Sequence, residues 1–392
     1  MSLTPEFVEQ LEFVHPRDIF NLLRQTNRHR TTTLWILKNE IRPVDLYCYL
    51  YARFGRPNGI QNFLRDDHSA NLIHWEWFLR SGSGSISILG MNFRTEIWIS
   101  STEELNDSDK DAFIRQIKSH FPTHGAEMSK VRKSLEHWIE FVNPYERIRH
   151  AVTRLLDDLA SLDLDANRDR IPDLWEQKSP EELKDTWEVQ AEKYSRAIGL
   201  CFGVRSMLPV MAEAFVNLLL YILMKQNLKK DARLSENIIR QPIDVRIRSL
   251  SNNCIGFKQH VDYDNDICKR YSTLVNERND LLHGNVVIDK LRFNDLYFNG
   301  RVPVFIQYSS MWERSYGVAH RSVGLDKIKE ELTVVDDLIE YLLSCLDDNY
   351  RDKVRAISDK FDLGVCLDDG RLGILFPDWV VDFAPVFERP NE

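Results

Sequence analysis

Residues 276–285 read NERNDLLHGN and place a fixed cation, an amide and an imidazole within about one and a half helical turns. The two leucines inside the stretch are typical of a helix face that packs on a core. Glycine directly after a histidine often ends a helix, because glycine takes the left-handed conformation without strain. The stretch therefore predicts a helix that ends at His283, with Asn279 on the same face. Arg278 lies about 140° round that helix and is long enough to reach the same rim.

A second feature is the apolar helix predicted over 206–229. Residues 207–224 are nearly all apolar but contain Glu213 and Asn217, which are four apart and share a face. A buried carboxylate is costly without a partner, and arginine is the natural one. Arg278 is the candidate partner. The alternatives are another Lys or Arg, or a surface position for Glu213.

The first 125 residues predict an α+β domain whose role the sequence does not reveal. Alternating and β-branched or aromatic residues favour a small antiparallel sheet, with glycines and serines at 81–85 as a turn. Trp75 and Trp77 share one strand face and are expected in the core rather than on a base-stacking surface. The expected helices span 5–29, 43–54 and 107–120, and the expected strands span 31–37, 72–79, 86–89 and 93–99.

The rest of the chain predicts mainly helices. Residues 126–178 are expected to form a helical connector, with helices over 131–142 and 145–162, followed by a charged linker. A capping box at Ser179 opens a helical bundle over 179–350. Further helices are expected over 264–283 and 324–348, with a loop that contains Arg240, Arg246 and Arg248 between the apolar helix and the first of these. Residues 351–392 are expected to form a C-terminal hairpin extension that turns at Asp369-Gly370.

Composition limits the class of protein. The chain has 392 residues and a net charge of −9, so it is not a globally basic nucleic-acid coat. Its six cysteines are widely spread without a CxxC pair, which favours reduced thiols and a cytoplasmic location over a disulfide scaffold or zinc finger. The first ten residues predict no secretory signal. The apolar stretch 207–224 is short for a membrane span and carries a carboxylate, so a buried helix of a soluble bundle is favoured.

The pattern of arginine, a polar Asn, three more residues, histidine and glycine at a helix end, after a long apolar helix with an inward Glu, resembles the HEPN family, the higher-eukaryote and prokaryote nucleotide-binding domain. The resemblance covers residues 180–350. It implies a bundle of four or five helices that pairs into a homodimer, and in many members a metal-independent endoribonuclease of prokaryotic defence or toxin–antitoxin systems. Arg278, Asn279 and His283 match its motif. Several toxin members carry tyrosine where this chain has Asn285, so no role is transferred to that position.

The chemistry of these residues suits RNA cleavage without a metal or other cofactor. The reaction needs a base for the 2′-hydroxyl, an acid for the leaving 5′-oxygen and a cation for the developing charge. Histidine can act as acid or base, and arginine matches phosphate geometry. The negative end of the helix favours the imidazolium, and Asn279 is expected to orient the ring. One chain supplies one such histidine, so a dimer is expected to supply both acid and base.

Local charge adds weaker support for RNA as a partner. Residues 225–283 contain eleven Lys or Arg against eight Asp or Glu, and phosphate binding draws on such patches. The predicted RNA contacts are Lys229, Lys230, Arg246 and Arg248. The alternative functions are a non-catalytic module that binds RNA, a nucleotide or a protein, and a regulatory or antitoxin-like subunit of a larger assembly. An antitoxin or regulatory protein is a further expected partner.

Overall fold

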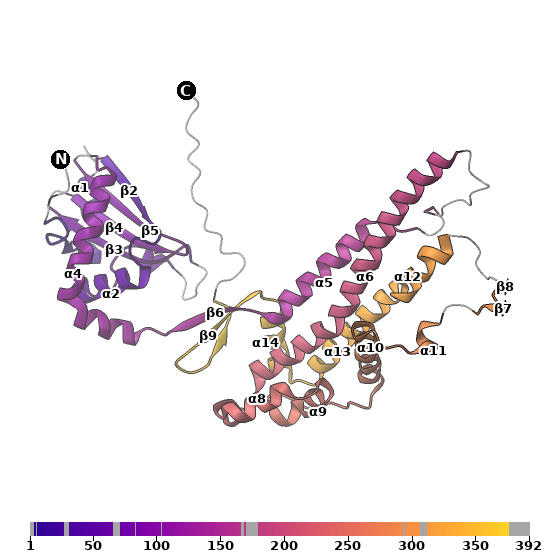
Figure 1. The fold of residues 1–392 in the computed structure, drawn as a ribbon. Coiled ribbons are helices and arrows are strands. Elements are labelled where there is room, and N and C mark those ends of the chain that lie inside the picture. Colours follow the sequence, from indigo (N-terminus) through magenta and orange to yellow (C-terminus); the bar gives the residue numbers. More distant parts are fainter. Residues whose placement is uncertain are drawn as a thin grey trace. The chain divides into compact units, whose positions relative to one another are not determined.

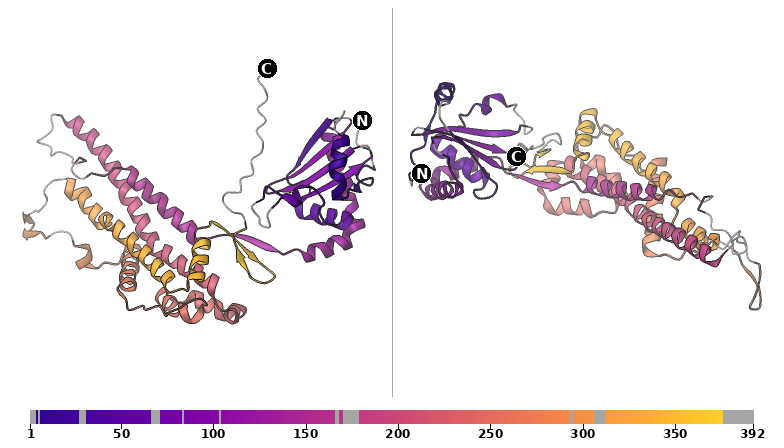
Figure 2. Two further views of the ribbon diagram at one scale, coloured as in Figure 1. Left: turned by 180° about the vertical axis from the view of Figure 1, so that it is seen from behind. Right: turned by 90° about the horizontal axis from the view of Figure 1, so that it is seen from above.

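The computed structural model of the chain describes residues 4, 6–26, 31–65, 71–82, 84–102, 104–165, 168–169, 179–292, 295–305 and 312–375. The chain forms two compact units. Unit 1 comprises residues 1–140 and 364–392, and unit 2 comprises residues 141–363. Figures 1 and 2 show a sheet with helices in the first and long helices in the second. The mixed α+β class is therefore confirmed.

Unit 1 is built on an antiparallel sheet, as the sequence predicts. Its five strands are ordered β1-β3-β4-β5-β2. They are β1 (Glu12–Phe13), β2 (Thr31–Leu37), β3 (Ile73–Ser81), β4 (Gly84–Met91) and β5 (Thr95–Ser101). Every neighbouring pair is antiparallel, and the tight turn between β3 and β4 falls at the predicted glycine–serine stretch.

Two helices cover one face of this sheet. Both α2 (Pro43–Phe54) and α4 (Asp107–Ser134) pack on it around the fully buried Trp77, and Trp75 packs against the same core. The core placement of both tryptophans is therefore confirmed. Phe78 points to the opposite face, where α1 (Pro16–Thr26) and the start of α3 (Gln61–Leu64) pack on it, because successive strand residues alternate.

Several predicted boundaries in the first part are wrong. Residues 5–29 contain β1 and α1 instead of one helix, and α4 continues through Pro122 to Ser134. The helix predicted over 131–142 gives way to strand β6 (Trp138–Val142). That strand belongs to a sheet of order β10-β9-β6, in which β9 (Asp362–Cys366) and β10 (Leu372–Gly373) form the predicted C-terminal hairpin. The partner of β6 comes from far along the chain, so local periodicity carries no sign of it.

Unit 2 is a bundle of long helices. Four of them make its framework: α5 (Pro144–Ser161), α6 (Pro180–Leu223), α10 (Asp266–His283) and α13 (Ile328–Ser344). In Figures 1 and 2, α5 and α13 lie along α6, and α10 packs against both α6 and α13. Shorter elements complete it: α7 (Gln226–Lys230), α8 (Ala232–Arg240), α9 (Ile243–Asn253), α11 (Ile288–Leu291), β7 (Tyr297–Asn299), β8 (Val302–Phe305), η1 (Glu313–Gly317), α12 (Val318–Ser322), η2 (Leu325–Lys327) and α14 (Asp348–Ser358).

The apolar helix differs from its prediction in length. It begins well before the predicted residue 206 and ends before residue 229, since α6 runs from Pro180 through Pro209 to Leu223. Within the described residues it is the one helix long and apolar enough to cross a membrane, and 61% of its most apolar window is buried inside the protein. That burial favours the core helix of a soluble protein over a membrane span. The loop expected around residues 240–248 is also wrong, because α8 and α9 occupy it.

Candidate functional site

The C-terminal end of α10 forms as the sequence predicts. Asn265 caps its first turn by accepting a hydrogen bond from the Cys268 N–H at 2.8 Å. Tyr271 and Leu274 are buried and fix the helix on the core. Gly284 takes the left-handed conformation, with φ 61°, and its N–H donates to the Asp280 carbonyl. The predicted helix end at His283 is therefore confirmed.

Arg278, Asn279 and His283 share this last part of α10 but are not joined in one network. Arg278 Nη1 donates to Asn279 Oδ1 at 2.9 Å, while Arg278 Nε is buried without a hydrogen-bond partner. The exposed His283 imidazole makes no hydrogen bond to any residue whose position is described. No hydrogen bond joins Asn279 to His283 in the described structure, so the expected orientation of the imidazole by this amide is not observed. Of these groups, the exposed His283 imidazole is open to a ligand, whereas Arg278 Nε is closed off by the protein.

Glu213 and Asn217 share one face of α6 and have a common arginine partner, but the partner is Arg246. The Arg246 guanidinium is buried, donates to the Glu213 carboxylate and the Asn217 amide oxygen, and donates from Nε to the Gln241 carbonyl at 2.8 Å. The requirement for an arginine is thus confirmed, and the proposal of Arg278 is wrong. The error follows from treating residues 240–248 as a loop, since α9 carries Arg246 into the bundle.

The two arginine groups nonetheless lie near one another at Tyr271. Its hydroxyl donates to the Pro209 carbonyl at 3.1 Å. Burial raises the pKa of Tyr271, the charge of Glu213 raises it further, and the charges of Arg246 and Arg278 oppose that shift. Tyr271 therefore lies close enough to the Glu213–Arg246 pair and to Arg278 to feel the charges of both.

The four predicted RNA contacts are in different surroundings. Arg246 is buried in its ion pair and is out of reach of an RNA backbone. Lys229 is half-buried over the Tyr221 ring, and burial lowers the pKa of its ammonium. Arg248 lies 4.1 Å from the centre of the Tyr263 ring and leaves half of its side chain exposed. Lys230 is exposed. Arg248 and Lys230 are thus the two of the four that a phosphate can reach.

A network around Arg205 was missed by the sequence analysis. Arg205 Nε is 2.8 Å from both carboxylate oxygens of Glu331, and Nη1 donates to the Val323 carbonyl at 2.9 Å. Arg205 Nη2 also reaches Glu277 Oε2 at 3.0 Å. Both Arg205 and Glu331 are buried. The signal was present in the sequence: Arg205 is a lone charge beside the apolar stretch of α6, and like Glu213 it requires a partner.

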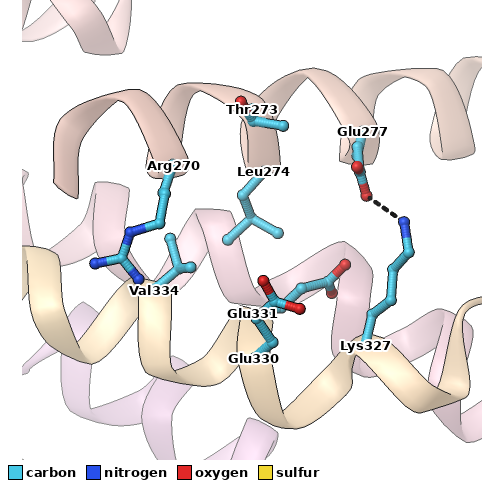
Figure 3. Close-up of a pocket in the computed structure, with 8 residues that line it drawn as sticks. All are labelled: Arg270, Thr273, Leu274, Glu277, Lys327, Glu330, Glu331 and Val334. Carbon is cyan, nitrogen blue, oxygen red and sulfur yellow. Dashed lines mark hydrogen bonds and ion pairs between the residues drawn. The ribbon is translucent and has the colours of Figure 1, made fainter. Parts of the chain in front are cut away.

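Figure 3 shows the cavity beside this network, between α10 and α13. It has a volume of about 190 Å³. On its wall, the Lys327 ammonium lies 3.5 Å from Glu277 Oε2. Glu277 directly precedes Arg278, so Arg205 and Lys327 together hold the segment of α10 that carries the motif. Arg270, Glu277, Lys327 and Glu331 on the wall all have partners of opposite charge, which indicates a structural role, whereas the exposed Glu330 pairs with no described residue.

Other chemistry is limited in the part of the chain that the structure describes. No group of three or more His, Cys, Asp or Glu side chains there is placed to hold a metal ion. The six cysteines are free and buried. Burial raises the pKa of Cys201 and Cys254 to about 12, which keeps these thiols protonated and unreactive.

Comparison of the chain with protein-family models, curated proteins and solved structures finds no match to any of them. The residues and their arrangement therefore carry the functional argument.

Proposed function

We propose that unit 2 is a metal-independent endoribonuclease of the HEPN type. The observation that carries the proposal is the end of α10, where Arg278, Asn279 and the exposed His283 precede a left-handed Gly284 in a bundle framed by four long helices. The arrangement supplies a half-buried cation and an exposed imidazole at one helix end.

The proposed reaction is an internal transesterification. The 2′-oxygen of RNA forms a bond to the adjacent phosphorus while the bond from phosphorus to the 5′-oxygen breaks, leaving a 2′,3′-cyclic phosphate and a 5′-hydroxyl. One imidazole accepts the proton of the 2′-hydroxyl, and another donates a proton to the 5′-oxygen. Arg278 binds the phosphate and stabilises the added charge of the transition state.

The two imidazoles are proposed to come from two copies of the chain. The segment that follows His283 supports self-association, because its large apolar side chains face solvent. The most exposed are Val286, Ile288, Leu291, Tyr297, Phe298, Val302 and Val304, each with 54–82% of its surface accessible. Exposed apolar side chains mark interaction sites where they gather on one surface. A two-fold axis beside this segment would bring the two His283 side chains together.

Cellular setting and RNA contacts extend the same proposal. Buried free cysteines and a mostly buried apolar helix support a cytoplasmic protein. A role in prokaryotic defence or stress response, with an antitoxin or regulatory partner, is proposed from the motif. Arg248 and Lys230 are the proposed auxiliary phosphate contacts, since the structure leaves them accessible.

A second candidate is a non-catalytic module of the same fold that binds RNA, a nucleotide or a protein. The exposed apolar segment 286–304 favours it, because that surface suits a different protein as well as a second copy.

The decisive experiment incubates the purified full-length chain with single-stranded RNA, in EDTA and in magnesium, and analyses the product ends. Arg278→Ala and His283→Ala should each reduce cleavage by at least about 100-fold while the protein stays folded. Arg240→Ala and His260→Ala are matched controls, since both side chains are exposed, and both variants should cleave normally. Retained cleavage in the His283 variant would overturn the proposal. Intact RNA that is nevertheless shifted on a gel by the wild type would favour the binding module.

A further inference from the structure

A cavity of about 390 Å³ lies in unit 2, where α5, α6, α13 and α14 meet, away from the motif at the end of α10. Its size is within the range of small-molecule sites. Its walls are held in place by Asn143, a fully buried residue that caps α5. The Asn143 side chain donates to the Ser358 carbonyl at 3.1 Å and the Lys360 carbonyl at 2.9 Å, which ties the start of α5 to the end of α14.

One part of the lining is aliphatic, and the rest is polar or charged. The aliphatic side chains come from α5, α6 and α13 and are Val152, Leu156, Met211, Leu332, Ile339 and Leu343. Such a surface binds the apolar body of a ligand, while a few polar groups fix its orientation.

Among the hydroxyls of the lining, Tyr145 is the one without a partner in the described structure. Thr153 Oγ1 donates to the Arg149 carbonyl at 3.0 Å, and Ser358 Oγ donates to the Arg355 carbonyl at 3.0 Å. Tyr145 is 6% exposed, and its hydroxyl makes no hydrogen bond to a described residue. The Tyr145 ring is buried, but its hydroxyl oxygen keeps accessible surface. The hydroxyl lines the cavity and is available to a ligand.

Among the charged groups of the lining, the arginines are paired and one carboxylate is not. Arg149 Nε is 2.5 Å from Glu146 Oε2, and its Nη2 is 3.6 Å from Asp359 Oδ1. Arg355 pairs with Glu340. Both arginines are therefore neutralised within the protein.

Asp336, at the exposed rim of the cavity, forms no ion pair or hydrogen bond with a described residue. Partial burial raises the pKa of its carboxyl, Asp337 and Glu340 raise it further, and Arg149 opposes them. The pKa of Tyr145 is raised to about 12, chiefly by burial and further by the charge of Asp336. Both Asp336 and Tyr145 line the cavity.

We propose that this cavity binds a small organic amine, whose ammonium group pairs with Asp336, whose second polar contact is the Tyr145 hydroxyl, and whose apolar body lies on the aliphatic wall. A cation fits because the unpaired charge is a carboxylate, whereas the arginines that an anion would need are already engaged.

Isothermal titration calorimetry on the full-length protein tests the site with 2-phenylethylamine as the probe and 2-phenylethanol as its neutral analogue. The wild type should bind the amine at least tenfold more tightly than the alcohol. Asp336→Asn should weaken amine binding about tenfold, because it removes the charge and keeps the shape. Tyr145→Phe should weaken it about threefold through loss of one hydrogen bond.

Two controls separate this site from its surroundings. Glu330→Gln removes the same charge from the same helix but outside the cavity, and it should leave binding unchanged. Arg278→Ala should bind the amine as the wild type does, so the result is independent of the proposed ribonuclease. Equal binding of amine and alcohol, no binding of either, or unchanged binding in the Asp336 variant would overturn the proposal.

Discussion

Arg205 and Arg278 lie on two helices that pack together, and they use their donors in opposite ways. Arg205 is buried and binds Glu331, Glu277 and the Val323 carbonyl. Arg278 binds the neighbouring Asn279 and leaves Nε without a partner. A structural arginine donates its hydrogen bonds to groups of the protein, whereas an arginine that binds a phosphate needs N–H groups that are not bonded within the protein. We therefore call Arg205 the anchor, because it holds the packed helices together, and we assign Arg278 to the candidate site.

The largest effect is expected when the anchor is broken. Arg205→Met leaves the buried Glu331 carboxylate without its cation and should lower the free energy of unfolding by about 3–5 kcal/mol. Arg278→Met removes one side-chain hydrogen bond and should cost about 1 kcal/mol or less. Urea unfolding followed by circular dichroism measures both.

A double variant tests whether the cost comes from the abandoned charge. Arg205→Met with Glu331→Met should recover most of the lost stability, because apolar side chains can replace a buried ion pair at little net cost. Equal destabilisation by the single substitutions at 205 and 278 would contradict the distinction between anchor and free arginine.

A smaller difference in stability is expected between alanine variants of two glycines, Gly284 after the helix of Arg278 and Gly324 beside Arg205. Gly284 and Gly324 have φ values of 61° and 65°, so an alanine is strained at either. An added Cβ at Gly284 meets nothing within 4 Å, whereas at Gly324 it would lie 2.6 Å from Arg205 Nη1. Gly284→Ala should therefore cost about 1 kcal/mol, and Gly324→Ala about 2–3 kcal/mol because the Arg205 guanidinium must move. Thermal and urea unfolding should rank them in that order, and the reverse order would contradict the proposed anchor.

These glycines also show what a sequence can predict about this protein. The end of α10 was predicted to the residue, because Gly284 acts locally: its left-handed conformation and its bond to Asp280 depend on adjacent residues. Gly324 carried no such signal. Its second constraint, the approach of Arg205, comes from a helix more than a hundred residues earlier and appears only when the bundle is assembled.

The candidate site divides in the same way. The apolar face around Glu213 correctly predicted an arginine partner, although the buried member of the pair is Arg246, since the Glu213 side chain is 37% exposed. It did not identify which arginine, because Arg246 reaches Glu213 through the packing of α9 on α6. The helix predicted over 131–142 was wrong for a related reason: β6 is a strand because β9 pairs with it. Sequence periodicity predicts which face of a helix or strand a residue lies on. Its partner depends on the packing of elements that are distant in the sequence.

The smallest expected effect concerns Asp336, an acid that is left unpaired as Arg278 Nε is. The pKa of Asp336 is raised above its ordinary value of 3.8, chiefly by burial. Between 3.8 and the raised pKa, the folded protein binds more protons than the unfolded chain, so stability falls as the pH rises through that window. The penalty is fully present at neutral pH and absent below 3.8.

Asp336→Asn should therefore raise the urea midpoint modestly near neutral pH and leave it unchanged below pH 3.8. If the Asp336→Asn protein is more stable than the wild type but no longer binds the amine, the carboxylate lowers the stability of the fold while it serves binding. This is expected of a binding group. If Asp336→Asn destabilised the protein at neutral pH, the carboxylate would instead be holding the fold together. Asp336 would then belong with Arg205 among the structural charges.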